Sequence, residues 1–220
     1  MNELPIARTT VATFLALILG GPTIALGQDH LGVPSSVLSG FKSLVDYDRM
    51  VRDTLLARTA EDPYVRAIVE PSFQSEWVVD VTPPTGGVAQ IQLVVATRPV
   101  WNGGTPLVQP IQRSDGTLTS DLAERLRRIW LNMLQGVRPS AKPRLGLDGV
   151  NYHFAAFVQG EGILAGEVWT PATDTRPERL VRLAMLLREV AEAPSSRRAS
   201  LLNRLRSESE AFARILGVDE

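Results

Sequence analysis

Apolar residues recur at helical spacing in four stretches of the chain. Recurrence at positions i, i+3, i+4 and i+7 predicts amphipathic helices that each bury one side. The last two stretches also carry end signals, because Thr175 and Glu178 have the spacing of a capping box and Gly217 is well suited to end a helix. The four predicted helices span residues 37–57, 121–135, 175–193 and 195–216.

Alternation with period two, together with β-branched residues, predicts four strands that form two hairpins. The first hairpin turns through the Pro- and Gly-rich residues 83–87, and the second turns through a glycine-bearing loop at 159–162. The four predicted strands span residues 76–82, 89–97, 151–158 and 163–170.

Taken in order, these elements predict an α+β fold with the order β-β-α-β-β-α, preceded by an N-terminal helix and closed by a C-terminal helix. Two hairpins that each bury a face under a helix join most simply edge to edge, as an antiparallel four-stranded sheet. The other sheet face is then open, or partly covered by the first or last helix. Between these elements we expect a short helical turn at residues 64–70, which Pro63 and Pro71 bracket, and a long loop at 99–117.

The first 27 residues have the composition of an export signal. Residues 9–19 form an uncharged apolar run, which Gly20-Gly21-Pro22 interrupts before it reaches the roughly 20 residues of a membrane span. Ala25-Leu26-Gly27 then places small residues where signal peptidase cleaves. We therefore expect a cleaved signal peptide over residues 1–27, a single α+β domain over 28–220, and a location in the periplasm or outside the cell.

Charge and composition narrow the possible partners. The net charge is −1 with and without the leader, because Glu3 and Arg8 cancel, so the chain has no overall field that would attract nucleic acid. The residues before the apolar run carry little positive charge for a signal peptide. An uncleaved membrane anchor is therefore the alternative to a cleaved signal peptide. The absence of cysteine excludes lipidation at cysteine, thiol nucleophiles and thiolate metal sites. Arginine greatly outnumbers lysine, which is typical of a GC-rich bacterial genome.

His153 is the main candidate for chemistry. Strand alternation places Tyr152 and Phe154 on the core face and His153 on the more polar face. Glu167 on the paired strand shares that face if the register allows it, and a carboxylate that orients an imidazole makes an acid/base pair. Asp148 is a second candidate carboxylate. A lone histidine on a strand is also common as a structural residue.

No recognised catalytic or metal-binding motif accompanies His153. The sequence lacks HExxH, GxSxG, Walker and GxGxxG patterns. The other histidine, His30, lies close to the expected new N-terminus, which we expect to be mobile. We therefore predict no metal and no cofactor.

Two classes of function remain. We favour a non-catalytic protein that binds another envelope or secreted protein or peptide, as inhibitors, immunity proteins and assembly factors do. Its binding surface is then the open sheet face or the long loop, with Trp101, Asn102, His153 and Trp169 as candidate contacts. The alternative is a small cell-envelope hydrolase that uses His153 with Glu167 or Asp148. The sequence predicts no stable membrane insertion after cleavage and leaves the oligomeric state open.

Overall fold

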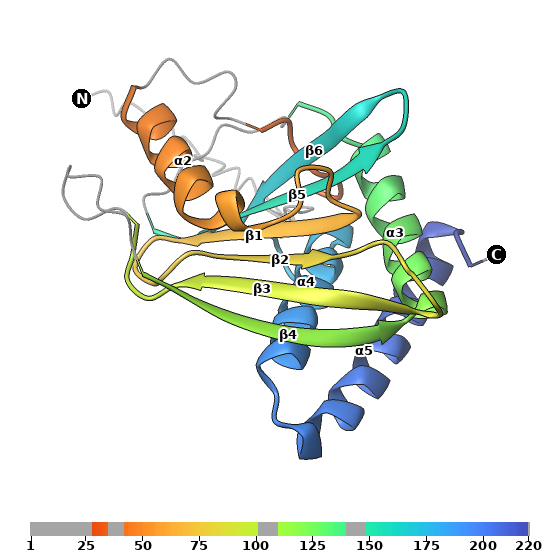
Figure 1. The fold of residues 1–220 in the computed structure, drawn as a ribbon. Helices are drawn as coiled ribbons and strands as arrows, with labels where there is room; N and C mark the ends of the chain where they lie inside the picture. The colour runs from red at the N-terminus through yellow and green to blue at the C-terminus, as the bar shows by residue number, and fades with distance from the viewer. Residues whose placement is uncertain (1–27, 35–41, 101–109, 140–147, 220) are drawn as a thin grey trace, which may run out of the picture.

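The computed structural model describes residues 28–34, 42–100, 110–139 and 148–219. These residues form one antiparallel sheet of six strands, in the order β4-β3-β2-β1-β5-β6, and four α-helices (Figure 1). The strands are β1 (Val65–Pro71), β2 (Trp77–Val81), β3 (Val88–Ala96), β4 (Ile111–Thr119), β5 (Val150–Val158) and β6 (Gly162–Trp169). The helices are α2 (Lys42–Leu55), α3 (Ser120–Gln135), α4 (Arg176–Glu192) and α5 (Ser195–Leu216), with a 3-10 turn at Leu56–Arg58. The predicted α+β class is confirmed.

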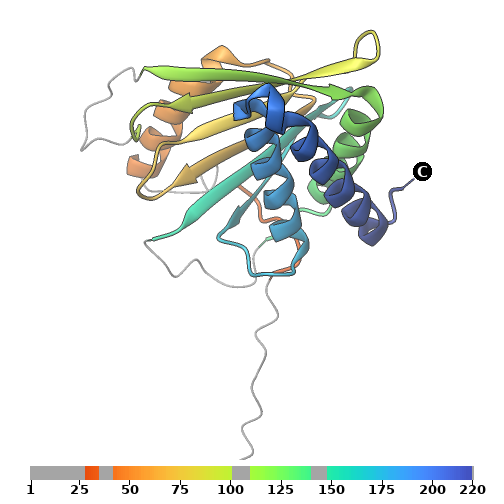
Figure 2. The same cartoon turned by 90° about the horizontal axis from the view of Figure 1, so that it is seen from below.

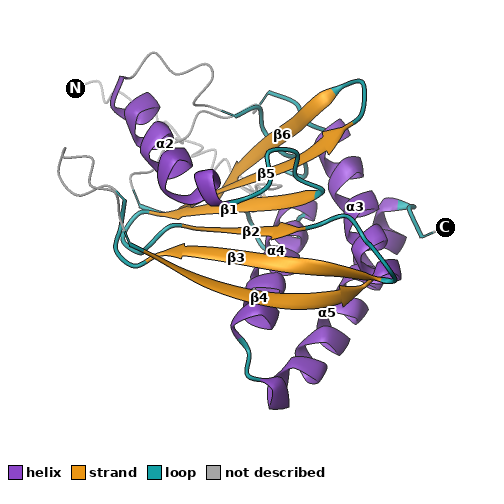
Figure 3. Cartoon of the chain, viewed as in Figure 1, coloured by secondary structure: helices purple, strands orange, loops and turns teal. Residues whose placement is uncertain are grey.

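The sheet lies between two unequal helical layers. Helices α3, α4 and α5 cover one face, and α2 crosses part of the other (Figures 2 and 3). The larger core lies under α3, α4 and α5 and includes Trp130, whose ring meets Phe154 edge-on at 5.8 Å between centroids. A smaller core lies under α2, where Val51 and Leu55 pack against Val78 and other apolar residues of the sheet. The second face is therefore partly covered.

Both predicted hairpins are confirmed, as β2 with β3 and as β5 with β6. The three predicted helices after residue 120 are also confirmed, as α3, α4 and α5. Thr175 caps α4 by accepting the Glu178 backbone N–H at 3.3 Å, and Gly217 ends α5 in the left-handed region at φ 69°. The N-terminal helix is described from Lys42, and residues 37–41 of its predicted span lie outside the described residues. No described helix is long and apolar enough to cross a membrane.

The predicted four-stranded sheet is wrong in detail, because the hairpins do not meet. Strand β1 lies between them and pairs with both β2 and β5. Residues 64–70 were expected to form a helical turn, yet β1 occupies almost all of them. Val65, Ala67 and Val69 are buried toward α3 and α4, and the intervening residues face α2. Pro63 and Pro71 therefore mark the ends of an extended segment and not of a helical turn.

The predicted long loop at residues 99–117 is also wrong in its second half. Residues 111–117 belong to β4, which pairs with β3 at nine consecutive positions and forms one edge of the sheet. Most of β4 is polar and exposed, so it lacks the apolar alternation by which a strand is predicted. Trp101 and Asn102, in the first half of that loop, lie outside the described residues.

The segment that follows the predicted cleavage site is part of the fold. Leu31 is completely buried in the larger core. Gly32 pairs with Glu167 on the outer side of β6, through backbone hydrogen bonds of 2.7 and 2.9 Å. The expectation that His30 lies in a mobile tail is therefore wrong, because the next two residues are fixed to the sheet.

Candidate functional site

The register of the second hairpin places His153 directly opposite Glu167. The two residues form a pair without mutual backbone hydrogen bonds, because Glu167 directs its backbone groups outward to Gly32. Side chains approach most closely at such positions. The Nδ1 atom of His153 lies 3.6 Å from Oε2 of Glu167. The structure thus brings together the two residues proposed as an acid/base pair.

A second carboxylate, Glu70 of β1, contacts the other ring nitrogen. Its Oε2 lies 3.0 Å from Nε2 of His153, and the amide nitrogen of Asn151 lies 2.7 Å from the same atom. The side chains of Glu70, His153 and Glu167 are only 9%, 17% and 7% exposed. The sequence analysis missed Glu70 because it predicted a helical turn where β1 lies. We call Glu70, His153 and Glu167 the carboxylate–histidine cluster.

The charges around His153 determine its protonation. Burial alone lowers its pKa, but the hydrogen bond and charge of Glu70 raise it, and the charges of Glu167 and Asp48 raise it further. The net effect is a pKa above the usual value of 6.5. His153 therefore holds a proton more tightly in the folded protein than in the unfolded chain.

Helix α2 supplies a further polar contact on this face of the sheet. The hydroxyl of Tyr47 donates to Oε1 of Glu76 at 2.8 Å, and the backbone N–H of Val100 donates to Oε2 of the same residue at 2.8 Å. Burial, followed by the charges of Glu70 and Glu76, raises the pKa of Tyr47 far above its usual range. Tyr47 thus stays neutral and ties α2 to the sheet.

This arrangement suits an ion pair better than a catalytic base. A general base must present a ring nitrogen to the substrate, whereas each nitrogen of His153 faces a carboxylate. Asp148, the other candidate partner, is exposed just before β5. Within the described ranges, no three histidine or acidic side chains are arranged to hold a metal ion.

Trp169, a candidate binding residue, packs against the backbone. A Cβ atom at Gly149 would lie 2.5 Å from its ring, so only glycine fits beneath it without rearrangement. Trp169 also pairs with Asn151 in the β5–β6 register and is half-buried. Its packing explains its position without a ligand. The remaining candidates, Trp101 and Asn102, lie outside the described residues.

The outer edge of β4 is a second candidate site. Backbone hydrogen bonds join Thr97 to Pro110 at one end of the β3–β4 ladder and Gly87 to Ser120 at the other. The register between them is continuous, so the even-numbered residues of β4 bond to β3 and the odd-numbered ones direct their N–H and C=O groups outward. In the part of the chain that the structure describes, no strand pairs with this edge. The residues with both groups directed outward are Ile111, Arg113, Asp115 and Thr117, because Thr119 is the N-cap of α3 and its C=O accepts within that helix.

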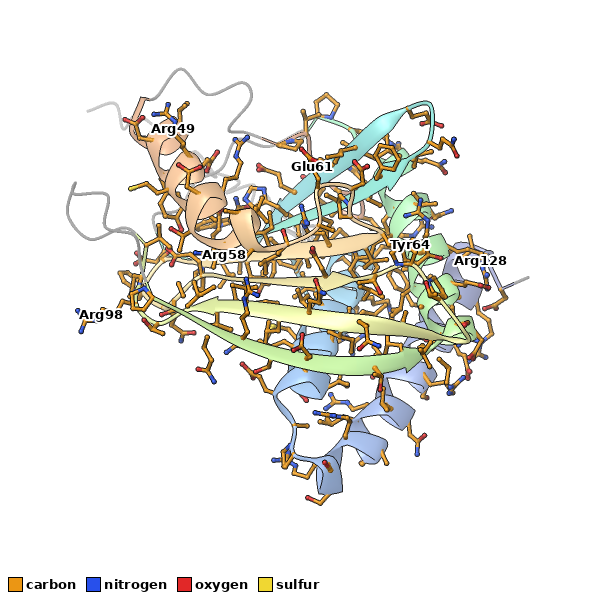
Figure 4. The ribbon with its side chains drawn as sticks, in the orientation of Figure 1. Arg49, Arg58, Glu61, Tyr64, Arg98 and Arg128 are labelled. Atoms are coloured by element: carbon orange, nitrogen blue, oxygen red, sulfur yellow. The ribbon has the colours of Figure 1, made fainter. Side chains whose placement is uncertain are left out.

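Two shallow hollows adjoin β4. The corner hollow, of about 170 Å³, lies where the end of β4 meets α3 and α5. The face hollow, of about 90 Å³, lies on the α2 side, where Figure 4 shows Arg58 at the end of that helix. The corner hollow is lined by Val88, Thr117, Leu118, Thr119, Leu122, Leu202 and Arg206. The face hollow is lined by Arg58, Gln92, Leu93, Val94, Arg113 and Asp115.

The chain matches no family model, no curated protein and no solved structure. Function must therefore be inferred from these two features, the carboxylate–histidine cluster and the β4 edge. The cluster is buried and internally paired, whereas the β4 edge presents exposed backbone groups beside two hollows. The edge is the better candidate for contact with another molecule.

Proposed function

We propose that this chain is an exported, non-catalytic bacterial protein that binds an extended segment of another envelope or secreted protein or peptide along β4. The observation that supports it is the row of outward backbone groups on four alternate residues of β4. An added strand satisfies these groups with main-chain hydrogen bonds, which is a common mode of peptide recognition. Export itself rests on the leader sequence of residues 1–27.

The two edges of the sheet support this choice of surface. Natural proteins usually cover or shorten edge strands, because exposed edges pair with other chains. The β6 edge is covered in part, where Gly32 pairs with Glu167. The β4 edge is nine residues long and has no covering strand among the described residues. Such a difference is expected if one edge is closed for stability and the other is used for binding.

Capture of partners from envelope extract, with the chain from Gln28 as bait, tests the proposal. Thr117→Pro removes an outward N–H without removing a β3–β4 hydrogen bond, so it blocks strand addition and leaves the sheet paired. We expect the wild-type protein to retain a specific partner and Thr117→Pro to lose at least about nine-tenths of it, because one missing bond and the ring both oppose an added strand. Quantitative mass spectrometry of the captured proteins measures the loss.

Two further variants make this result interpretable. Thr117→Val keeps the backbone donor and should retain the partner, which separates backbone pairing from side-chain contact. Asp115→Pro removes a different outward donor and should behave like Thr117→Pro. Equal capture by the wild-type and both proline variants, with each variant folded by circular dichroism, would show that β4 is not the binding edge.

A further inference from the structure

We infer that the segment added to β4 carries an apolar side chain for the corner hollow and an acidic side chain for the arginines of the face hollow. This inference rests on the proposed function and specifies the chemistry of its partner. An edge strand supplies affinity through its backbone, and pockets beside the strand select side chains at alternate positions. The two hollows flank β4 in the way that such selection requires.

The corner hollow favours an apolar side chain. Leu118, Leu122 and Leu202 contribute much of its wall. The one charged residue in its lining, Arg206, is already paired, because it lies 2.6 Å from Asp121 and 3.2 Å from the Thr119 hydroxyl. At about 170 Å³, the corner hollow has room for a leucine side chain.

The face hollow favours an acidic side chain. Two arginines, Arg58 and Arg113, and one carboxylate, Asp115, line it, which leaves one positive charge in excess. Arg113 is exposed on the outermost strand, where a residue of an added strand lies directly opposite it. Residues directly opposite each other in an antiparallel pair share one face, and opposite charges there attract.

Strand geometry relates the two side chains. The residue opposite Leu118 points to the same side as Leu118, toward the helices, and the residue opposite Arg113 points to the α2 side. These positions are five residues apart on β4, and an odd separation places them on opposite faces. In an added strand that runs antiparallel to β4, as every neighbouring pair in this sheet does, the acidic residue follows the apolar residue by five positions.

Synthetic peptides test this inference directly. The probe is a fluorescent nine-residue peptide of threonine and serine with leucine at its second position and aspartate at its seventh. We expect replacement of the aspartate by lysine to raise the Kd for the protein from Gln28 onward about five-fold or more, because an attraction becomes a repulsion at a solvent-exposed pair. Fluorescence polarisation measures the Kd. Replacement of the leucine by aspartate should also weaken binding.

Reversal of the protein charge is the matched control. Arg113→Glu should favour the lysine peptide over the aspartate peptide, reversing the wild-type preference. An Arg113→Glu variant with the wild-type preference, or no binding of the aspartate peptide at millimolar concentration, overturns the inference. If Thr117→Pro abolishes binding but neither peptide substitution changes the Kd, the proposed side-chain selection alone is refuted. Binding that ignores Thr117→Pro would instead contradict strand addition.

Discussion

Replacing His153 by alanine is expected to lower the free energy of unfolding by about 3–5 kcal/mol at neutral pH. The side chain of His153 lies between Glu70 and Glu167, at 3.0 and 3.6 Å, and both carboxylates are at least nine-tenths buried. In His153→Ala, the two buried carboxylates lose the ring that lies between them and that each of them contacts. Chemical denaturation, followed by circular dichroism, measures the difference.

The difference in free energy of unfolding between wild type and His153→Ala should depend on pH in a definite direction. The pKa of His153 is higher in the folded protein than its usual 6.5. A histidine of this kind contributes its full stabilisation below its unfolded pKa and loses it as the pH rises through the folded value. The difference between wild type and His153→Ala should therefore be larger at about pH 6 than at about pH 9.

The other histidine supplies the control. His30→Ala should change the stability by less than about 0.5 kcal/mol, because no carboxylate contact accompanies its ring among the described contacts. In the double variant His153→Ala with Glu167→Gln, removal of one carboxylate should restore part of the loss. A His153→Ala protein as stable as wild type at both pH values would refute the charged cluster.

A chain that starts at Val33 should be less stable than one that starts at Gln28 by about 4 kcal/mol, the sum of one buried leucine and two backbone hydrogen bonds. The shorter chain lacks Leu31, which is completely buried, and Gly32, which bonds to Glu167. It also lacks the neighbouring ion pair between Asp29 and Arg176. Thermal unfolding of the two purified chains compares them.

Leu31→Ala in the chain from Gln28 separates burial from backbone pairing. This variant should lose about 2–4 kcal/mol, because a cavity replaces the leucine beside Gly166 and Val137. Equal melting temperatures for the chains from Gln28 and from Val33 would show that the segment contributes nothing. In that case the pairing of Gly32 with β6 would not close that edge in solution.

Local patterns in the sequence predicted the elements whose two faces differ. Helices α3, α4 and α5 each bury one apolar side, Thr175 caps the start of α4, and Gly217 ends α5. Strand β1 was missed because flanking prolines in a short segment suggested a turn, and because Ile68 interrupts the alternation of apolar and polar residues. Its polar residue Arg66 is buried and bonded to Asp80, a compensation that only the assembled sheet reveals.

Strand β4 could not be predicted from its own residues. Its exposed polar side chains give no apolar face, and pairing with β3 makes it a strand. The candidate functional residues were difficult to predict for the same reason. Alternation identified the sheet face on which His153 lies, but not its register with Glu167. Glu70 could not be identified as a neighbour of His153, because β1 was not predicted as a strand. Edge position, which distinguishes β4 and β6 from the four strands between them, is a property of the whole sheet.

Amide hydrogen exchange, resolved residue by residue along β4, tests the central claim most directly. In the free protein, the N–H groups of Arg113, Asp115 and Thr117 should exchange rapidly, while those of Gln112, Ser114 and Gly116 exchange slowly because they bond to β3. Addition of a captured partner should slow the first set and leave the second set unchanged. Slow exchange of the first set in the free protein, or rapid exchange in the complex, would contradict strand addition at β4.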